Sequence, residues 1–376
     1  MPELFLTVFF ISILLIFLGT GIWVALSMVG VSAIGMLLFT TRPVGDAMAT
    51  TIWGTSSSWT LTALPLFVWM GEILFRTKLS ENLFKGLSPW MSRLPGGLIH
   101  VNVVGCALFA AISGSSAATV ATVGKMSIPE LRKRNYPEKL LLGSLAGSGT
   151  LGLLIPPSII LIIYGVTVQE SIAKLFIAGI IPGIMLAIFF MFYVICWSIL
   201  NKDIMPKAET KFSFYEKIKG SSQLIPVIIL IISVIGSIYA GIATATEAAS
   251  LGVIGALILS FFQKSLNKET FKLSLLGATK TSCMIAFILA GSSFLSLAMG
   301  FTGLPRNLAI WIQEMNLSPY VLILVLTVFY IILGMFLDGI SAVVLTMAII
   351  EPMIRQAGLD MIWFGIFLVI VVEMAQ

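Results

Sequence analysis

Apolar stretches long enough to cross a lipid bilayer recur along nearly the whole chain, and they constrain its fold more than any other feature. Each is about 17 to 25 residues long, which suits the roughly 30 Å hydrocarbon core of a membrane. The 376 residues are 58% hydrophobic and 10% charged, and their mean hydropathy is +1.06. Soluble domains are only about 45–50% apolar. The sequence therefore predicts an all-α, polytopic membrane protein with no soluble domain between its crossings.

The rest of the composition excludes several classes of protein. Cys106, Cys196 and Cys283 lie in apolar stretches without CxxC spacing, so neither a disulfide framework nor a metal cluster is indicated. The apolar stretches carry no paired acid and base residues, so an enzyme is the least favoured class. We interpret the net charge of +5 as a sign of basic cytoplasmic loops, with no nucleic-acid partner.

The basic residues predict which loops face the cytoplasm, because Lys and Arg accumulate on that side of a membrane. Here they accumulate in four segments, at 76–93, 125–139, 201–219 and 264–280. Counting crossings back from these segments places the N-terminus outside. Residues 79–93 mix apolar and basic side chains at helical spacing, which predicts a helix lying in the membrane interface.

A single apolar segment, at about 96–128, separates the first two basic segments. One crossing would put its flanks on opposite sides of the membrane, so we predict a re-entrant hairpin that enters from the cytoplasm, turns and returns. The turn falls at Ser113-Gly114-Ser115-Ser116. Non-helical backbone at this depth is tolerated only where it is buried in protein or lines a cavity. The tip is therefore expected to be either packed or functional.

Landmarks of the first half recur in the second half at an offset of about 220 to 225 residues, pairing Gly21 with Gly241, Asn82 with Asn307, Pro129 with Pro352, Arg132 with Arg355 and Gly143 with Gly365. The first half has an odd number of crossings, so the second begins on the opposite side, as in inverted-repeat transporters. We expect a first repeat at 1–200, a cytoplasmic connector at 201–221 and a second repeat at 222–376. The first repeat would hold a broken helix at about 137–175. The second would hold its own hairpin at about 319–354.

The stretch GSLAGSGTLGLLIPPSI, residues 143–159, breaks a helix within an apolar segment. Pro156 and Pro157 each remove a backbone donor, and Gly147 and Gly149 weaken the helix before them. In hydrocarbon each unsatisfied backbone group costs several kcal/mol, so the freed carbonyl groups need partners. Na⁺ would be one, since hard cations prefer oxygen ligands. The hydroxyl ligands at hand are those of Thr150, Ser113, Ser115 and Ser116.

Two half-helices would also direct their positive N-terminal ends toward the middle of the membrane, where they favour an anion such as a carboxylate. One begins at Ser116-Ala117 and the other near Pro156-Pro157-Ser158, and these residues are expected to bind the anion. Cation ligands and anion-binding ends together predict cotransport of Na⁺ with an organic acid. The alternative is that the breaks are kinks packed against neighbouring helices, since Pro and Gly are common in membrane helices.

Three acidic residues in or beside apolar segments are functional hypotheses by default, namely Glu72, Glu247 and Asp338. Glu247 lies near a predicted helix end, where it could simply face water. Asp338 has more support, because it falls at the tip of the hairpin predicted in the second repeat.

Four motifs resemble those of the large membrane subunit of tripartite ATP-independent periplasmic (TRAP) transporters: ALFAAISGSSAATVATVG, AGSGTLGLLIPPSIILIIYG, GIATATEAAS and LGMFLDGISAVVLTMAIIEP. The resemblance covers essentially the whole chain. It implies a bacterial inner-membrane protein with an elevator mechanism, in which two hairpins and two broken helices slide against a scaffold; the N-terminus that the count of crossings places outside would then be periplasmic. It implies a small membrane subunit of Q type and a periplasmic binding protein as partners. It also implies Na⁺ sites at the hairpin tips and broken helices, which here match Ser113, Gly114, Ser115, Ser116, Gly147, Gly149, Thr150, Gly334, Asp338 and Gly339.

The expected function is therefore import of an organic acid, such as a C4-dicarboxylate or a sialic acid, with Na⁺ as the coupling ion and no other cofactor. One alternative is a stand-alone Na⁺/carboxylate symporter with a similar inverted-repeat fold. A channel is the alternative from a different class. Members of the family continue past VVEMAQ into a second Pro-Pro break, so we expect the second repeat to be incomplete here, as in a fragment.

Overall fold

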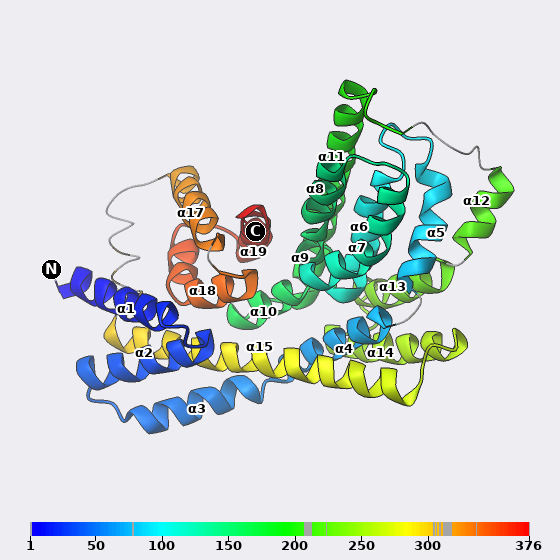
Figure 1. Ribbon diagram of the computed structural model, residues 1–376. Coiled ribbons are helices and arrows are strands. Elements are labelled where there is room, and N and C mark those ends of the chain that lie inside the picture. The colour runs from blue at the N-terminus through cyan, green and yellow to red at the C-terminus, as the bar shows by residue number, and fades with distance from the viewer. Residues whose placement is uncertain are drawn as a thin grey trace. The chain divides into compact units, whose positions relative to one another are not determined.

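The computed structural model describes residues 2–76, 79–206, 213–222, 224–303, 318–335 and 337–375, together with Pro305, Asn307 and Ile310. These residues form helices joined by short loops, with no strand among them (Figure 1). Five helices within the described ranges are long and apolar enough to cross a membrane, and up to seven if each of two bent pairs counts as one span. The prediction of an all-α integral membrane protein is thus confirmed.

The chain divides into two compact units, each assembled from separate stretches of sequence. One unit comprises Met1–Thr62, Ile162–Leu175 and Thr281–Gln376. The other comprises Ala63–Leu161 and Phe176–Lys280. Two helices, α10 (Ile159–Thr167) and α15 (Lys268–Thr302), begin in the second of these units and end in the first.

The unit of residues 63–161 and 176–280 contains both of the breaks predicted in the first half of the chain. Helices α6 (Ile99–Ser113), α7 (Ser116–Lys133) and α8 (Glu138–Gly149) pack against one another, and the short α9 (Leu151–Leu154) packs on α6. Besides the first residues of α10 and α15, this unit also includes α4 (Ala63–Phe75), α5 (Leu79–Met91), α11 (Ile172–Leu200, from Phe176 onward), α12 (Phe214–Ser221), α13 (Ile225–Tyr239) and α14 (Ala245–Phe262).

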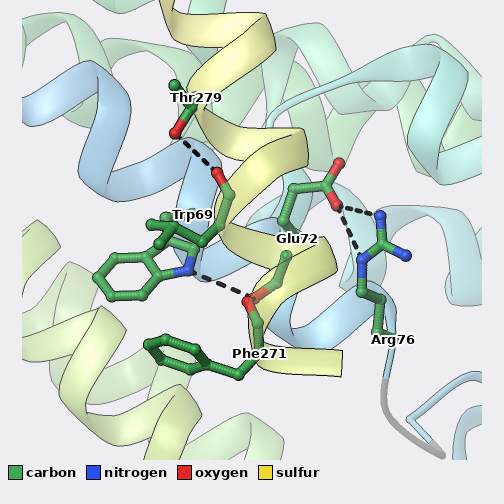
Figure 2. Close-up of polar contacts among 7 residues, drawn as sticks. Trp69, Glu72, Arg76, Phe271 and Thr279 are labelled. Carbon is green, nitrogen blue, oxygen red and sulfur yellow. Dashed lines mark hydrogen bonds and ion pairs between the residues drawn. The ribbon is translucent and has the colours of Figure 1, made fainter. Parts of the chain in front are cut away.

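Helix α4 is fixed to its neighbours by close packing and by a polar contact from an aromatic side chain. It packs along α14, and Figure 2 shows its contact with the first part of α15. The Trp69 Nε1 donates a hydrogen bond of 3.4 Å to the Ser274 hydroxyl, and the indole ring meets the Phe271 ring edge to face. The half-buried indole N–H thus finds an acceptor on α15, and the contact holds this face of α4 toward that helix.

The other unit contains the second hairpin. It is formed by α17 (Pro319–Gly334) and α18 (Gly339–Gln356), and α19 (Met361–Ala375) packs against both, as the orange and red helices of Figure 1 show. The N-terminal part contributes α1 (Pro2–Gly19), α2 (Val24–Phe39), α3 (Val44–Ser56) and the 3₁₀ turn η1 (Trp59–Thr62). The core of this unit includes Met36, Phe294 and Ala298, which are fully buried.

Several helices expose apolar side chains, as expected for surfaces that face lipid. Along α11, Ile181 is 76% exposed and Phe192 is 62% exposed. A soluble protein would rarely leave a contiguous apolar surface of this kind uncovered. The exposed faces therefore agree with the membrane assignment made from helix length.

Candidate functional site

The turn between α6 and α7 is a sharp break made by two residues with different backbone conformations, left-handed at Gly114 and extended at Ser115. Gly114 ends α6 in the left-handed region at φ +59°, which glycine adopts at no steric cost. Ser115 then begins α7 as its N-cap, and its hydroxyl accepts a bond of 3.5 Å from the Ala118 amide. The sequence Ser-Gly-Ser-Ser thus ends one helix and starts the next with no intervening loop.

Oxygen atoms converge around this tip. The Ser113 and Thr119 hydroxyls lie 2.8 Å apart, and the Ser113 hydroxyl donates at 3.3 Å to the Ser115 carbonyl. The Thr119 hydroxyl also donates to the Ser115 carbonyl, at 2.7 Å. Ser113 and Thr119 are buried, and with one proton each the two hydroxyl groups find their acceptors in the Ser115 carbonyl and in each other's oxygen. Sequence reasoning missed Thr119, although its position three residues after Ser116 places it in the first turn of α7.

The second break follows α8 and separates it from α10. The helix ends at Gly149, the Thr150 hydroxyl donates at 2.8 Å to the Gly147 carbonyl, and α9 adds one further turn. The chain then passes through the cis peptide bond between Pro156 and Pro157 before α10 begins.

Ser158 supplies the hydrogen bonds that the two prolines cannot make. Its hydroxyl donates to the Leu153 carbonyl and accepts a bond of 3.3 Å from the Leu161 amide, and its side chain is fully buried. A Ser158 hydroxyl engaged in this way already satisfies one freed carbonyl and one early amide of α10.

The two breaks touch each other. The Ile159 amide donates a bond of 3.4 Å to the Gly114 carbonyl, and a Cβ on Gly114 would lie 2.7 Å from the Pro157 carbonyl oxygen. Gly152 lies equally close to the other side of the tip, because a Cβ there would be 2.7 Å from the Ser115 carbonyl oxygen. The structure thus brings together the hairpin tip and the double-proline break, which the sequence separates by about 40 residues.

The N-terminal ends of the two half-helices differ in how open they are. In α10, the Ile159 amide is bonded to Gly114 and the Leu161 amide is bonded to Ser158. In α7, Ser116 is partly exposed and Ala117 is exposed. Free amide groups and a positive helix end favour an anion. Of the residues predicted to bind an anion, Ser116 and Ala117 are therefore the more exposed.

The break between α17 and α18 has a similar construction. Gly334 is buried at the end of α17, and Asp338 is the N-cap of α18, accepting a bond of 3.2 Å from the Ser341 amide. Gly339 is buried at the start of α18. Gly334 lies against α19, because a Cβ on it would be 3.6 Å from the Val372 carbonyl oxygen. The three predicted residues of this break therefore lie at one end of the α17–α18 hairpin, with the end of α19 beside Gly334.

Glu373 is an acidic residue at this level that sequence reasoning passed over. It follows Val372 on α19, its side chain is 5% exposed, and neither carboxylate oxygen has a hydrogen-bond partner among the described residues. An ionisable side chain inside an apolar segment is unusual in a membrane helix. The signal was present in the run MIWFGIFLVIVVEM, where Glu373 is the one acid.

Two other acids singled out from the sequence have structural partners. The Glu72 carboxylate accepts bonds of 3.2 and 3.0 Å from the Arg76 guanidinium one turn later, and it lies against Gly277 of α15 (Figure 2). Glu247 closes a capping box at the start of α14, accepting a bond of 2.8 Å from the Thr244 amide. These contacts favour the structural interpretation of both residues.

Comparisons with known proteins agree with one another on a single family. The family described as "Tripartite ATP-independent periplasmic transporter, DctM component" matches residues 9–376. The chain is 31% identical to the C4-dicarboxylate TRAP transporter large permease protein DctM of Pseudomonas aeruginosa, over 91% of this chain and 79% of the relative. It is 32% identical to the 2,3-diketo-L-gulonate TRAP transporter large permease protein YiaN of Escherichia coli, over 86% and 76%. It is 30% identical to the sialic acid TRAP transporter large permease protein SiaM of Vibrio cholerae, over 94% and 82%.

Proposed function

The chain belongs to the family of the DctM component of tripartite ATP-independent periplasmic transporters, and from this premise we propose that it is the large membrane subunit of a Na⁺-coupled importer of an organic acid. The observation that carries the proposal is the contact between the SGSS tip and the double-proline break. Hydroxyl and carbonyl oxygens lie there beside an accessible helix N-terminus, and these groups suit a cation and a carboxylate respectively.

The substrate is proposed to be a small carboxylate. The named relatives transport a C4-dicarboxylate, 2,3-diketo-L-gulonate and sialic acid, which all carry a carboxylate group. The amide groups at Ser116 and Ala117 would bind that group, because they are the open end of the helix that starts at the tip. Pro156, Pro157 and Ser158 would form the wall behind it, since all three are buried and the Pro157 carbonyl lies against the tip.

The coupling ion is proposed to be Na⁺, bound at each of the two breaks. At the first break the ligands would come from Ser113 to Ser116 and from Gly147 to Thr150. At the second they would come from Gly334, Asp338 and Gly339, with Glu373 as a further carboxylate on α19. A bound cation would compensate the Glu373 charge, which is costly to bury alone.

The mechanism is proposed to be an elevator, in which the hairpins α6–α7 and α17–α18 move as re-entrant elements of inverted repeats. The protein would lie in a bacterial inner membrane with its N-terminus in the periplasm. Its partners would be a small membrane subunit and a periplasmic binding protein, in keeping with the word tripartite in the family description.

Uptake by reconstituted complexes tests this proposal. Proteoliposomes containing the large and small subunits would be supplied with the cognate binding protein and with radiolabelled C4-dicarboxylate or sialic acid. We expect saturable uptake that requires both an inward Na⁺ gradient and the binding protein. Uptake driven equally well by K⁺ would remove Na⁺ coupling from the proposal.

Two other outcomes correspond to the alternative functions. Uptake without any binding protein would identify a stand-alone symporter. Single-channel currents that do not saturate with the acid would identify a channel instead.

A further inference from the structure

Arg355, in the last turn of α18, contacts a segment 187 positions earlier in the chain. Its Nη2 donates a hydrogen bond of 3.0 Å to the backbone carbonyl of Val168, just after α10. The same guanidinium lies 2.9 Å from the carboxylate of Glu351, one turn back on α18, and 3.8 Å from that of Glu170. One cationic side chain therefore joins the end of the second hairpin to the loop that follows the double-proline break and α10.

A second contact, which is buried, joins the same two regions. Tyr164, in α10, is fully buried, and its hydroxyl donates a bond of 2.6 Å to the carbonyl of Met361 at the start of α19. Gly365, one turn along α19, makes room for the ring, because a Cβ there would lie 2.9 Å from the ring Cδ1. The end of α10 is thus fixed to the corner between α18 and α19 by two independent contacts.

The position of Arg355 is favourable for two helices at once. It lies in the last turn of its own helix α18, and it binds a carbonyl at the end of α10, which stops at Thr167. After that end the chain turns through Gln169 at φ 56°, and the Glu170 amide bonds back to the Gly165 carbonyl at 2.9 Å. Helix C-termini carry partial negative charge and unpaired carbonyl groups, so a guanidinium stabilises both ends.

Arg132, the counterpart of Arg355 in the predicted repeat, has a different partner. It also lies in the last turn of a hairpin helix, α7, but it pairs with Glu138 only six positions along, at the start of α8. The two arginines have similar exposure, 56% and 47% for their side chains. A basic residue at this position can therefore find an ion-pair partner close by in the sequence. The long-range contact of Arg355 is a feature that Arg132 does not share.

We propose that Arg355 is a positioning residue that fastens the end of α10 to the α18–α19 corner, so that this half-helix and the second hairpin move as one body during transport. This inference rests on the proposed function, because it assigns both segments to the moving part of an elevator. Arg355 acts through the backbone carbonyl of Val168 and makes no contact with the candidate ion or substrate residues described above. Its removal should therefore slow the transport cycle without weakening substrate binding.

The first test replaces the side chain. Arg355→Ala should lower the maximal uptake rate about tenfold, the effect of losing one hydrogen bond to a charged group, while the KM for the acid stays unchanged. Arg355→Lys keeps the charge and a donor and should recover most of the rate. Arg132→Ala, the matched control, should change the rate little, because exposed local ion pairs contribute little. An equal loss in the Arg132→Ala and Arg355→Ala variants would overturn the proposal.

The second test replaces the contact by a covalent bond. Glu170→Cys and Arg355→Cys are combined after the three native cysteines are removed, and the pair is joined by a short, reducible thiol cross-linker. The reduced protein lacks the arginine and should transport slowly, and cross-linking should restore its rate toward that of the cysteine-free parent. If the two segments separate during the cycle, cross-linking will abolish the remaining uptake, and reduction will bring it back. That result would overturn the inference and leave the proposed function intact.

Failure of the proposed function would look different. The cysteine-free parent and the reduced variant would then both fail to take up any acid tested, in the presence of the binding protein. The rate of cross-linking with and without Na⁺ would still test the inference. Equal rates are expected for two segments that stay together, and a rate that falls on adding Na⁺ would contradict it.

Discussion

The tip of the α6–α7 hairpin requires glycine for two reasons: Gly114 has a left-handed backbone conformation, and Gly152 of α9 packs too closely against the tip to carry a side chain. Gly152 has ordinary helical geometry, yet a Cβ on it would lie 2.7 Å from the Ser115 carbonyl oxygen and 2.9 Å from the Ser116 nitrogen. Both atoms belong to backbone, which cannot turn aside as a flexible side chain can. The close approach of Gly152 therefore fixes the distance between the double-proline segment and the tip.

Gly152→Ala should push the tip away from the break. Overpacking of this kind costs about 1–3 kcal/mol of stability, and we expect uptake to fall by at least about tenfold because the candidate ion ligands separate. Gly143→Ala is the matched control on the preceding helix, since a Cβ added there would meet no heavy atom of the described residues within 4 Å. Thermal unfolding in detergent and Na⁺-driven uptake would be measured for both. Full uptake by Gly152→Ala would show that the tip does not need this spacing.

The hydroxyls of the tip allow a second residue-level prediction. Ser115→Ala removes the N-cap of α7 and one oxygen near the tip, so the Na⁺ concentration needed for half-maximal uptake should rise several-fold. Ser158→Ala is a useful contrast, because the Ser158 hydroxyl is engaged with Leu153 and Leu161 and should affect stability more than Na⁺ dependence. Sodium titrations of initial uptake rates would separate the two. An unchanged Na⁺ dependence for Ser115→Ala would remove that side chain from the ion site.

At the scale of single helices, the sequence was a good guide to where elements break. Gly and Pro mark the breaks at Gly114 and at Pro156-Pro157, because their backbone restrictions act locally. It was a poor guide to which distant elements touch. The Arg355 contact with Val168 depends on how helices pack, and no local pattern records it. The Glu72–Arg76 pair, by contrast, is local, because the two residues lie one turn apart on α4.

Helix α14 shows how an acidic residue in a membrane segment can be structural. The Glu247 carboxylate accepts bonds from the Thr244 amide at 2.8 Å and the Thr244 hydroxyl at 2.9 Å, while the Thr244 hydroxyl accepts from the Glu247 amide at 3.3 Å. This reciprocal pair satisfies amide groups that the helix itself leaves unpaired.

Glu247→Ala should therefore lower the stability of the protein modestly, because the Thr244 amide loses its acceptor, without a specific loss of transport. Glu247→Gln keeps an oxygen at the same position and should retain nearly full stability. Thermal unfolding of the purified variants would give the stabilities, and uptake per folded molecule would give the activities. A Glu247→Gln variant that is stable but inactive would show that the carboxylate charge has a role in transport.

At the scale of the whole molecule, the two compact units and the two predicted repeats divide the chain in different ways. The repeats follow sequence order, at 1–200 and 222–376, whereas each unit gathers separate stretches such as Ile162–Leu175 with Thr281–Gln376. A repeat is a relation of symmetry and a unit is a set of helices in contact, so the two divisions need not coincide. The inverted repeat makes its own prediction, which concerns the side of the membrane on which each loop lies.

If the α6–α7 hairpin is re-entrant, the residues before and after it must face the same side of the membrane. Arg93→Cys and Lys133→Cys, at exposed positions that flank the hairpin, should both resist a membrane-impermeant maleimide in spheroplasts and react in inverted vesicles. Ser171→Cys, in the loop after α10, should show the opposite pattern, because one crossing separates it from Lys133. Each cysteine would be introduced alone into a chain without the three native ones. Labelling of Arg93→Cys and Lys133→Cys from opposite sides would mean that α6 and α7 together cross the membrane. The ion site proposed at their junction would then lose the inward-facing backbone on which it depends.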